Sequence, residues 1–278
     1  MRDDLKVRVV ALTALLLVLG VVECVATEPV TSAPAERPTE DKESIPQVAA
    51  PNSTKMGATS DEMRSMISGV LGEIDDRWSE IFKASGQAYS GPRIVLFHDA
   101  TKGGRCGMVQ ATKGPFYCAP DKQIFLDTGF FREVETRLKC SGSTCRFTST
   151  YMIAREVGHH VQNLLGILPR VTRLQQQAGS KEESNALQVK VELQADCLAG
   201  LWVNREEKKR PGFLKAGDID AVLTILSALS DDTLQSQETG VVPDSFTYGS
   251  AEQRKHWFMI GYQQGLFQAC NTFSAEKQ

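Results

Sequence analysis

The chain has 278 residues, of which 41% are hydrophobic and 23% are charged. This composition is ordinary for a globular protein and leaves room for one large domain or two small ones. The net charge of −3 gives no electrostatic reason to expect a nucleic-acid partner.

The N-terminal residues 1–26 have the pattern of an export signal. Arg2, Lys6 and Arg8 precede an apolar run from Val9 to Val22, and a basic stretch before an apolar one is typical of such signals. The run is shorter than the ~20 residues of a spanning helix, although its neighbours can extend it. We therefore expect an exported protein, with this segment either cleaved as a signal peptide or kept as a membrane anchor. Seven cysteines agree with an oxidising compartment.

Residues 27–59 are rich in Pro, Thr, Ser and Glu and contain almost no large apolar side chains. Such a segment cannot bury enough surface to order itself, so we expect a disordered linker. An ordered domain is expected over 60–275. It begins with a helix whose apolar residues recur every three or four positions: Met63, Met66, Ile67, Val70, Leu71, Ile74 and Trp78.

A small β element is expected next. Residues 93–97 form a β-type run ending at His98 and Asp99. Residues 106–127 suggest a hairpin-like pair whose arms Cys106 and Cys118 can bridge. A short loop separates Cys140 from Cys145, which leaves Cys197 with Cys270 as the third pair. Six cysteines allow fifteen pairings, so these assignments stay open.

The central helix is expected to start at a Ser149 or Thr150 cap and to end at Pro169. Gly158 inside it costs about 1 kcal/mol against Ala, which suggests that another backbone comes close there. Arg155 and His159 share one face, and Glu156 shares the next face with His160. A second helix places Glu192 and Asp196 one turn apart.

Three features are expected in the C-terminal part. A core helix runs from an Asp218 cap to Leu229, and Asp231-Asp232 follows it as a turn or cap. Residues 243–249 form a loop, and an amphipathic helix over 252–267 carries a structural His256. Tyr248, where the loop meets this helix, could donate a hydrogen bond to a transition-state oxyanion in an active enzyme.

With His in place of Arg155, the central helix would read H-E-x-x-H, in which two histidines hold Zn²⁺ and the Glu activates a metal-bound water. The chain resembles the neutral zinc metallopeptidase family of bacterial exported or membrane-anchored proteins, with H-E-x-x-H plus E-x-x-x-D as in gluzincins. The resemblance rests on 106–107, 114–118, 153–162, 192–200, 217–219, 242–246 and 253–258.

The resemblance implies an α+β, mostly helical, zincin-like metallopeptidase domain with a small disulfide-bearing β element, acting on a peptide or protein. It further implies Glu156 as general base, His159 and Glu192 as zinc ligands, and Asp196 as the residue that orients them. Two positions depart from the family pattern, because Arg155 replaces the first ligand histidine and Tyr248 replaces another histidine.

Arginine cannot ligate Zn²⁺, since it stays protonated and offers only donors. We expect Arg155 to pair with Glu192 or Asp196 and to hold the two helices together without the metal. One functional hypothesis is a degenerate, zinc-poor peptidase that serves as an extracytoplasmic binding or regulatory module. The other is an active zinc endopeptidase with a replacement ligand. His160 points about 100° away from His159, and His98, His256 and Tyr248 are remote in sequence.

Overall fold

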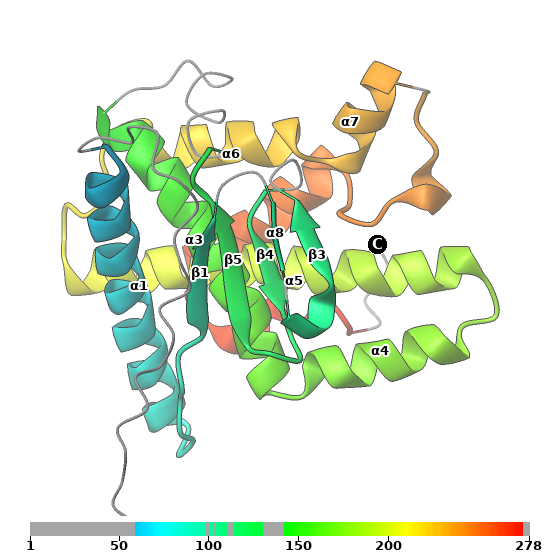
Figure 1. Cartoon of the computed structure of the whole chain (residues 1–278), viewed down its shortest axis with the longest axis horizontal. Coiled ribbons are helices and arrows are strands. Elements are labelled where there is room, and N and C mark those ends of the chain that lie inside the picture. The colour runs from blue at the N-terminus through cyan, green and yellow to red at the C-terminus, as the bar shows by residue number, and fades with distance from the viewer. Residues whose placement is uncertain are drawn as a thin grey trace, which may run out of the picture. The chain divides into compact units, whose positions relative to one another are not determined.

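The computed structural model describes residues 59–97, 100–102, 104–110, 114–129, 142–238 and 240–274. These residues lie in one compact unit, Ser53–Gln278, which is mostly helical and carries a small sheet (Figure 1). The expected export signal, most of the linker, His98, Asp99 and Cys140 lie outside them. Among the helices of this described part, none is long and apolar enough to cross a membrane.

The sheet has the strand order β1-β5-β4. Strand β1 (Arg93–Phe97) pairs in parallel with β5 (Gln123–Asp127), and β4 (Phe116–Cys118) pairs antiparallel with the other side of β5. A separate ladder joins β2 (Ala100–Lys102) to β3 (Met108–Gln110). The strand over 93–97 and the hairpin are thus confirmed.

The disulfide between Cys106 and Cys118 is confirmed, but Cys106 does not lie on a hairpin arm. It lies in the 3-10 helix η1 (Gly104–Cys106), so the bond joins η1 to β4. Cys197 and Cys270 form a second disulfide across 73 residues, also as expected. Cys145 is disulfide-bonded as well, and its expected partner Cys140 is outside the described residues.

Helices α1 (Thr59–Ala84), α3 (Gly142–Leu164) and α5 (Lys181–Lys209) supply most of the core. The apolar stripe expected on α1 is confirmed, with Ile67, Ile74 and Trp78 fully buried. Helix α3 crosses α5 at Gly158, where a Cβ atom would stand 3.1 Å from the carbonyl oxygen of Ala195. The close approach expected from Gly158 is therefore present, and it brings the functional faces of α3 and α5 together.

Two expected boundaries of the central helix are wrong. Helix α3 begins at Gly142, and Ser149 and Thr150 lie inside it. Their hydroxyls donate to the carbonyls of Cys145 (3.1 Å) and Arg146 (2.9 Å), one turn back. Pro169 does not end α3 but lies in the first turn of α4 (Ile167–Gln177). Proline is tolerated there because first-turn N–H groups have no acceptor within the helix.

The C-terminal part contains α6 (Asp218–Ala228), α7 (Asp231–Glu238), η3 (Pro243–Ser245), α8 (Ala251–Gln264) and η4 (Phe267–Cys270). The cap of α6 is Gly217 (φ 87°) and not Asp218, whose carboxylate instead accepts from the N–H of Lys215. Ser250 and Gln253 cap α8 reciprocally. Helix α8 stops at Gln264, three residues before the expected end, because Gly265 caps it at φ 61°.

Candidate functional site

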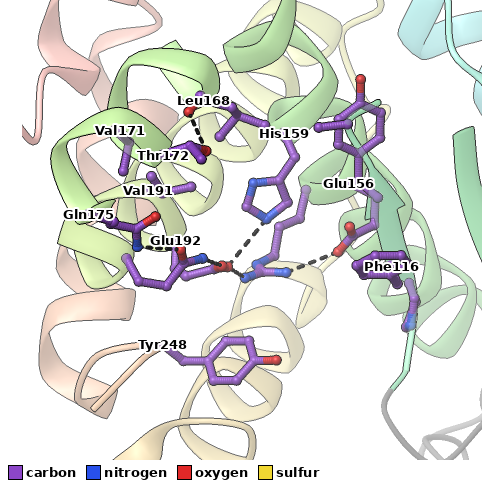
Figure 2. A pocket seen from close by; sticks show the side chains of 15 residues that line it. Phe116, Glu156, His159, Leu168, Val171, Thr172, Gln175, Val191, Glu192 and Tyr248 are labelled. Atoms are coloured by element: carbon purple, nitrogen blue, oxygen red, sulfur yellow. Dashed lines mark hydrogen bonds and ion pairs between the residues drawn. The ribbon is translucent and has the colours of Figure 1, made fainter. Parts of the chain in front are cut away.

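A cavity of about 260 Å³ opens where α3, α4 and α5 meet the edge strand β4. Figure 2 shows the side chains that line it, with Glu156, His159 and Glu192 facing its inner end. Arg155 also belongs to the lining. Phe116 and Tyr248 lie at two different sides of the opening. The sequence motifs on α3 and α5, which are far apart along the chain, therefore form one site.

Arg155 occupies the centre of this site and binds three carboxylates. Its Nε donates to Asp196 Oδ1 at 3.0 Å, its Nη1 donates to Glu156 Oε1 at 3.0 Å, and its Nη2 pairs with Glu192 Oε2. Only 12% of the side chain is exposed. The expected pairing with Glu192 or Asp196 is confirmed, and Arg155 takes both at once.

Asp196 is fully buried and lies behind Arg155. Besides Arg155 it accepts hydrogen bonds from the Tyr151 hydroxyl (2.6 Å) and from Nε (2.9 Å) and Nη2 (3.2 Å) of Arg254 on α8. Sequence reasoning missed Arg254. The available signal was its helical spacing with Phe258 and Gly261, which share the buried face of α8. Its partner is 58 residues away.

His159 lies in the same face as Arg155, as the four-residue spacing predicts. Its Nδ1 is 2.9 Å from Gln162 Oε1 and its Nε2 is 3.3 Å from Glu192 Oε2. Gln162 is fixed in turn, because its amide nitrogen donates to the Val191 carbonyl and to Gln194. Both nitrogens of His159 thus face acceptors, an arrangement that a doubly protonated ring satisfies.

The charges in the site shift the pKa values of its members. Burial lowers the pKa of His159, but the neighbouring Glu192 and Glu156 together outweigh burial and raise it above its usual value. Burial raises the pKa of Glu192, but Arg155 and then His159 outweigh this and bring it down to about 2. Glu156 behaves differently, because its burial dominates and raises its pKa. Of these two carboxyls, Glu156 therefore holds a proton more readily.

His160 belongs to the structure of the core and not to the cavity. Its Nδ1 lies 2.9 Å from the Tyr117 hydroxyl and its Nε2 lies 2.6 Å from the Ser90 carbonyl oxygen. Burial lowers the pKa of this ring. The separate roles expected for the two adjacent histidines are thus visible: His159 faces the site, and His160 packs between Tyr89 and Tyr117.

The residues present do not fit a zinc ion. In the described part of the chain, no group of three or more His, Cys, Asp or Glu side chains is arranged to hold a metal. The decisive point is chemical, because the guanidinium of Arg155 already holds Glu192, one of the two remaining candidate ligands. A fixed cation at this place repels Zn²⁺, and two protein ligands fall short of the three that catalytic zinc sites use.

Tyr248 covers the guanidinium from the cavity side, with Arg155 Cζ 5.9 Å from the ring centroid. Its loop is held by Asp231, whose Oδ2 accepts from the N–H groups of Thr247 (2.7 Å), Tyr248 (2.5 Å) and Gly249 (2.8 Å). The sequence predicted only a turn or cap at Asp231. Its contact with a loop sixteen to eighteen residues away was missed.

Comparison with known proteins gives the family. A family model described as "Putative neutral zinc metallopeptidase" matches residues 6–273. The chain belongs to this family. Among its relatives, "Uncharacterized protein YpfJ" of Escherichia coli strain K12 is 42% identical over 214 residues, which cover 77% of this chain and 72% of the relative. "Uncharacterized protein Mb2605" of Mycobacterium bovis is 40% identical over 204 residues, covering 70% and 67%. No solved structure matches the chain.

Proposed function

We propose that this protein is a non-hydrolytic member of its metallopeptidase family, which binds a segment of polypeptide in the cavity without a metal ion. We place it outside the cytoplasmic membrane, where its disulfides can form and persist. The export signal that we infer from residues 1–26 would bring it there. In this view the family's catalytic cleft serves recognition or regulation.

One observation carries the proposal: Arg155 is bonded to Glu156, Glu192 and Asp196. A metal in this cleft would balance the charge of these carboxylates, and the guanidinium supplies that positive charge permanently. Glu156 remains, but its role as general base depends on a metal-bound water that this site is not built to hold. Tyr248, the other candidate catalytic residue, stacks on the same cation and closes one side of the cavity.

The test is a comparison of the full-length protein with Arg155→His, both purified with zinc present and then dialysed. We expect less than about 0.1 equivalent of zinc and no cleavage of unfolded casein for the wild type. Arg155→His rebuilds a set of three ligands with His159 and Glu192 and should bind about one equivalent. The control is Arg155→His combined with Glu192→Gln, which should lose the metal again.

Stoichiometric zinc in the wild type, with cleavage that a chelator abolishes, would overturn the proposal in favour of an active endopeptidase. Arg155 would then have to release Glu192 and move out of the cavity, and another residue would have to supply the replacement ligand. A wild type that binds casein without cutting it, detected by retention on the immobilised full-length protein, supports the binding function.

A further inference from the structure

We infer that the cavity selects an uncharged apolar side chain of the bound polypeptide, and that the selecting surface is the arm of the cavity between α4 and α5. This inference rests on the proposed binding function and adds the class of ligand. The arm is formed by Leu168, Val171, Thr172 and Gln175 on α4 and by Gln188 and Val191 on α5.

The arm has an apolar floor and a neutral rim. Val171 and Val191 are each only 3% exposed, and Leu168 lies one turn before Thr172 on the same face of α4. The two glutamines form the rim, where Gln175 Nε2 donates to Gln188 Oε1 at 3.2 Å and Gln188 Nε2 donates to Glu192 Oε1 at 2.6 Å. Figure 2 shows Leu168, Val171, Val191 and Gln175 together on the side of the cavity next to Glu192.

The charged residues at the inner end of the cavity do not favour a charged ligand, because they are already paired within the protein. Among the residues that line the cavity, only Arg155, Glu156, His159 and Glu192 carry ionisable charge apart from the tyrosine hydroxyls. Each of them already contacts an oppositely charged partner within the protein: Arg155 binds Glu156 and Glu192, and His159 faces Glu192. A ligand carboxylate would meet Glu156 and Glu192 as well as Arg155, and a ligand amine would meet Arg155 as well as the carboxylates. Either ion would be desolvated without finding an unpaired group of opposite charge, which costs free energy. An apolar side chain has no such desolvation cost.

The opening suits a chain that passes across the cavity. Phe116 on the edge strand β4 is 36% exposed, and Tyr248, at another side of the opening, is 41% exposed. Large side chains that are this exposed at the mouth of a cavity supply apolar contact for a ligand. The arm then accepts one side chain of Val, Leu, Ile or Met size, and the rest of the segment remains at the mouth.

The experiment uses immobilised full-length protein and a positional-scanning library of octapeptides. One position at a time is fixed as Leu, Val, Asp, Lys or Gly, and all other positions carry uncharged residues. Bound peptides are counted by mass spectrometry. We expect Leu or Val to be retained roughly 10- to 100-fold over Asp and Lys, the ratio that burial of one such side chain supports.

Two variants locate the selection. Thr172 is exposed and lines the arm, so Thr172→Trp should fill the arm and remove the preference for Leu and Val. Arg173→Trp is the matched control, because Arg173 is exposed, adjacent, and not part of the lining. It should leave the preference unchanged. Gln175→Lys should move the preference toward Asp, and Gln175→Glu should move it toward Lys.

The outcomes separate the two proposals. Peptide retention with no preference among the fixed residues, or a preference that Thr172→Trp leaves intact, would overturn the selectivity while the binding function stands. A preference for Asp or Lys in the wild type would overturn the inference that the cavity selects an uncharged side chain. If neither octapeptides nor unfolded casein are retained, the proposed binding function is wrong, and the proposed selectivity is wrong as well.

Discussion

At the scale of single residues, the side chain of Arg155 dominates the charge of the cavity. Arg155 lies at the centre of the site, and its three N–H···O contacts connect two helices through a nearly buried cation. A buried ion pair is weak evidence for stability as such, but removing one member leaves charges without compensation. The contribution of Arg155 to stability is therefore best measured by replacing Arg155 and leaving the carboxylates in place.

We predict that Arg155→Gln lowers the free energy of unfolding by about 3–5 kcal/mol at pH 7, because Glu192 and Glu156 keep their burial and lose their cation. Urea unfolding of the full-length variant, followed by circular dichroism, measures the loss. Arg173→Gln on the exposed face of α4 is the control and should change stability by less than about 0.5 kcal/mol. An Arg155→Gln protein as stable as the wild type would mean that the guanidinium is not compensating these carboxylates.

A second prediction concerns the dependence of stability on pH. The pKa of Glu192 falls from 4.5 to about 2 in the folded state. Because the folded value lies below the unfolded one, Glu192 stabilises the fold fully above about pH 4.5 and loses that contribution as the pH falls toward 2. The shift corresponds to roughly 3 kcal/mol. Glu192→Gln should therefore flatten the stability curve between pH 4.5 and 2, and equal slopes for both proteins would contradict the assigned shift.

At the scale of elements, the helix crossings are set by glycines. A Cβ at Gly261 on α8 would stand 1.9 Å from the Cys197 carbonyl oxygen, and one at Gly200 on α5 would stand 2.2 Å from the Phe258 carbonyl oxygen. Helices α5 and α8 thus touch backbone to backbone at two places. This contact matters for the site because α5 carries Asp196 and α8 carries its partner Arg254.

We predict that Gly261→Ala destabilises the protein by about 3 kcal/mol or more, since neither backbone can move aside without separating α5 from α8. Gly69→Ala on α1 is the matched control, because nothing lies within 4 Å of its added Cβ. It should stabilise by about 0.5–1 kcal/mol through helix propensity. Thermal melts of the two variants give the comparison, and a Gly261→Ala protein that melts with the wild type would disprove the close crossing.

The parts of the site that follow from local spacing were predictable, and the parts that depend on distant contacts were not. Four-residue spacing put Arg155 with His159 and Glu192 with Asp196, and charge complementarity then paired the two helices. The start of α3 was misplaced, because Ser149 and Thr150 are good caps that turn out to bond one turn back. Arg254 and Asp231 bond to residues far away in the chain, and the spacing of residues along one helix does not reveal such distant partners.

At the scale of the whole molecule, the two disulfides whose cysteines are both described differ in burial and in loop length. Cys197 and Cys270 are both fully buried, and their bond ties the C-terminal η4 to α5 across 73 residues. The bond between Cys106 and Cys118 spans 12 residues at the end of the sheet, and Cys106 is partly exposed. By loop length, the first contributes about 4 kcal/mol and the second about 3 kcal/mol against the unfolded chain.

We predict that a mild thiol reductant opens these two bonds in a fixed order. Under native conditions the reductant can reach Cys106, whereas attack on Cys197 or Cys270 requires α5, α8 and η4 to separate first. Trapping free thiols with iodoacetamide and mapping them by mass spectrometry should therefore show Cys106 and Cys118 labelled well before Cys197 and Cys270. In about 6 M urea, which removes the protection of the fold, the difference should disappear. Equal rates in native buffer would mean that the C-terminal end leaves α5 without global unfolding, and the pairing of Asp196 with Arg254 behind the cavity would then be mobile too.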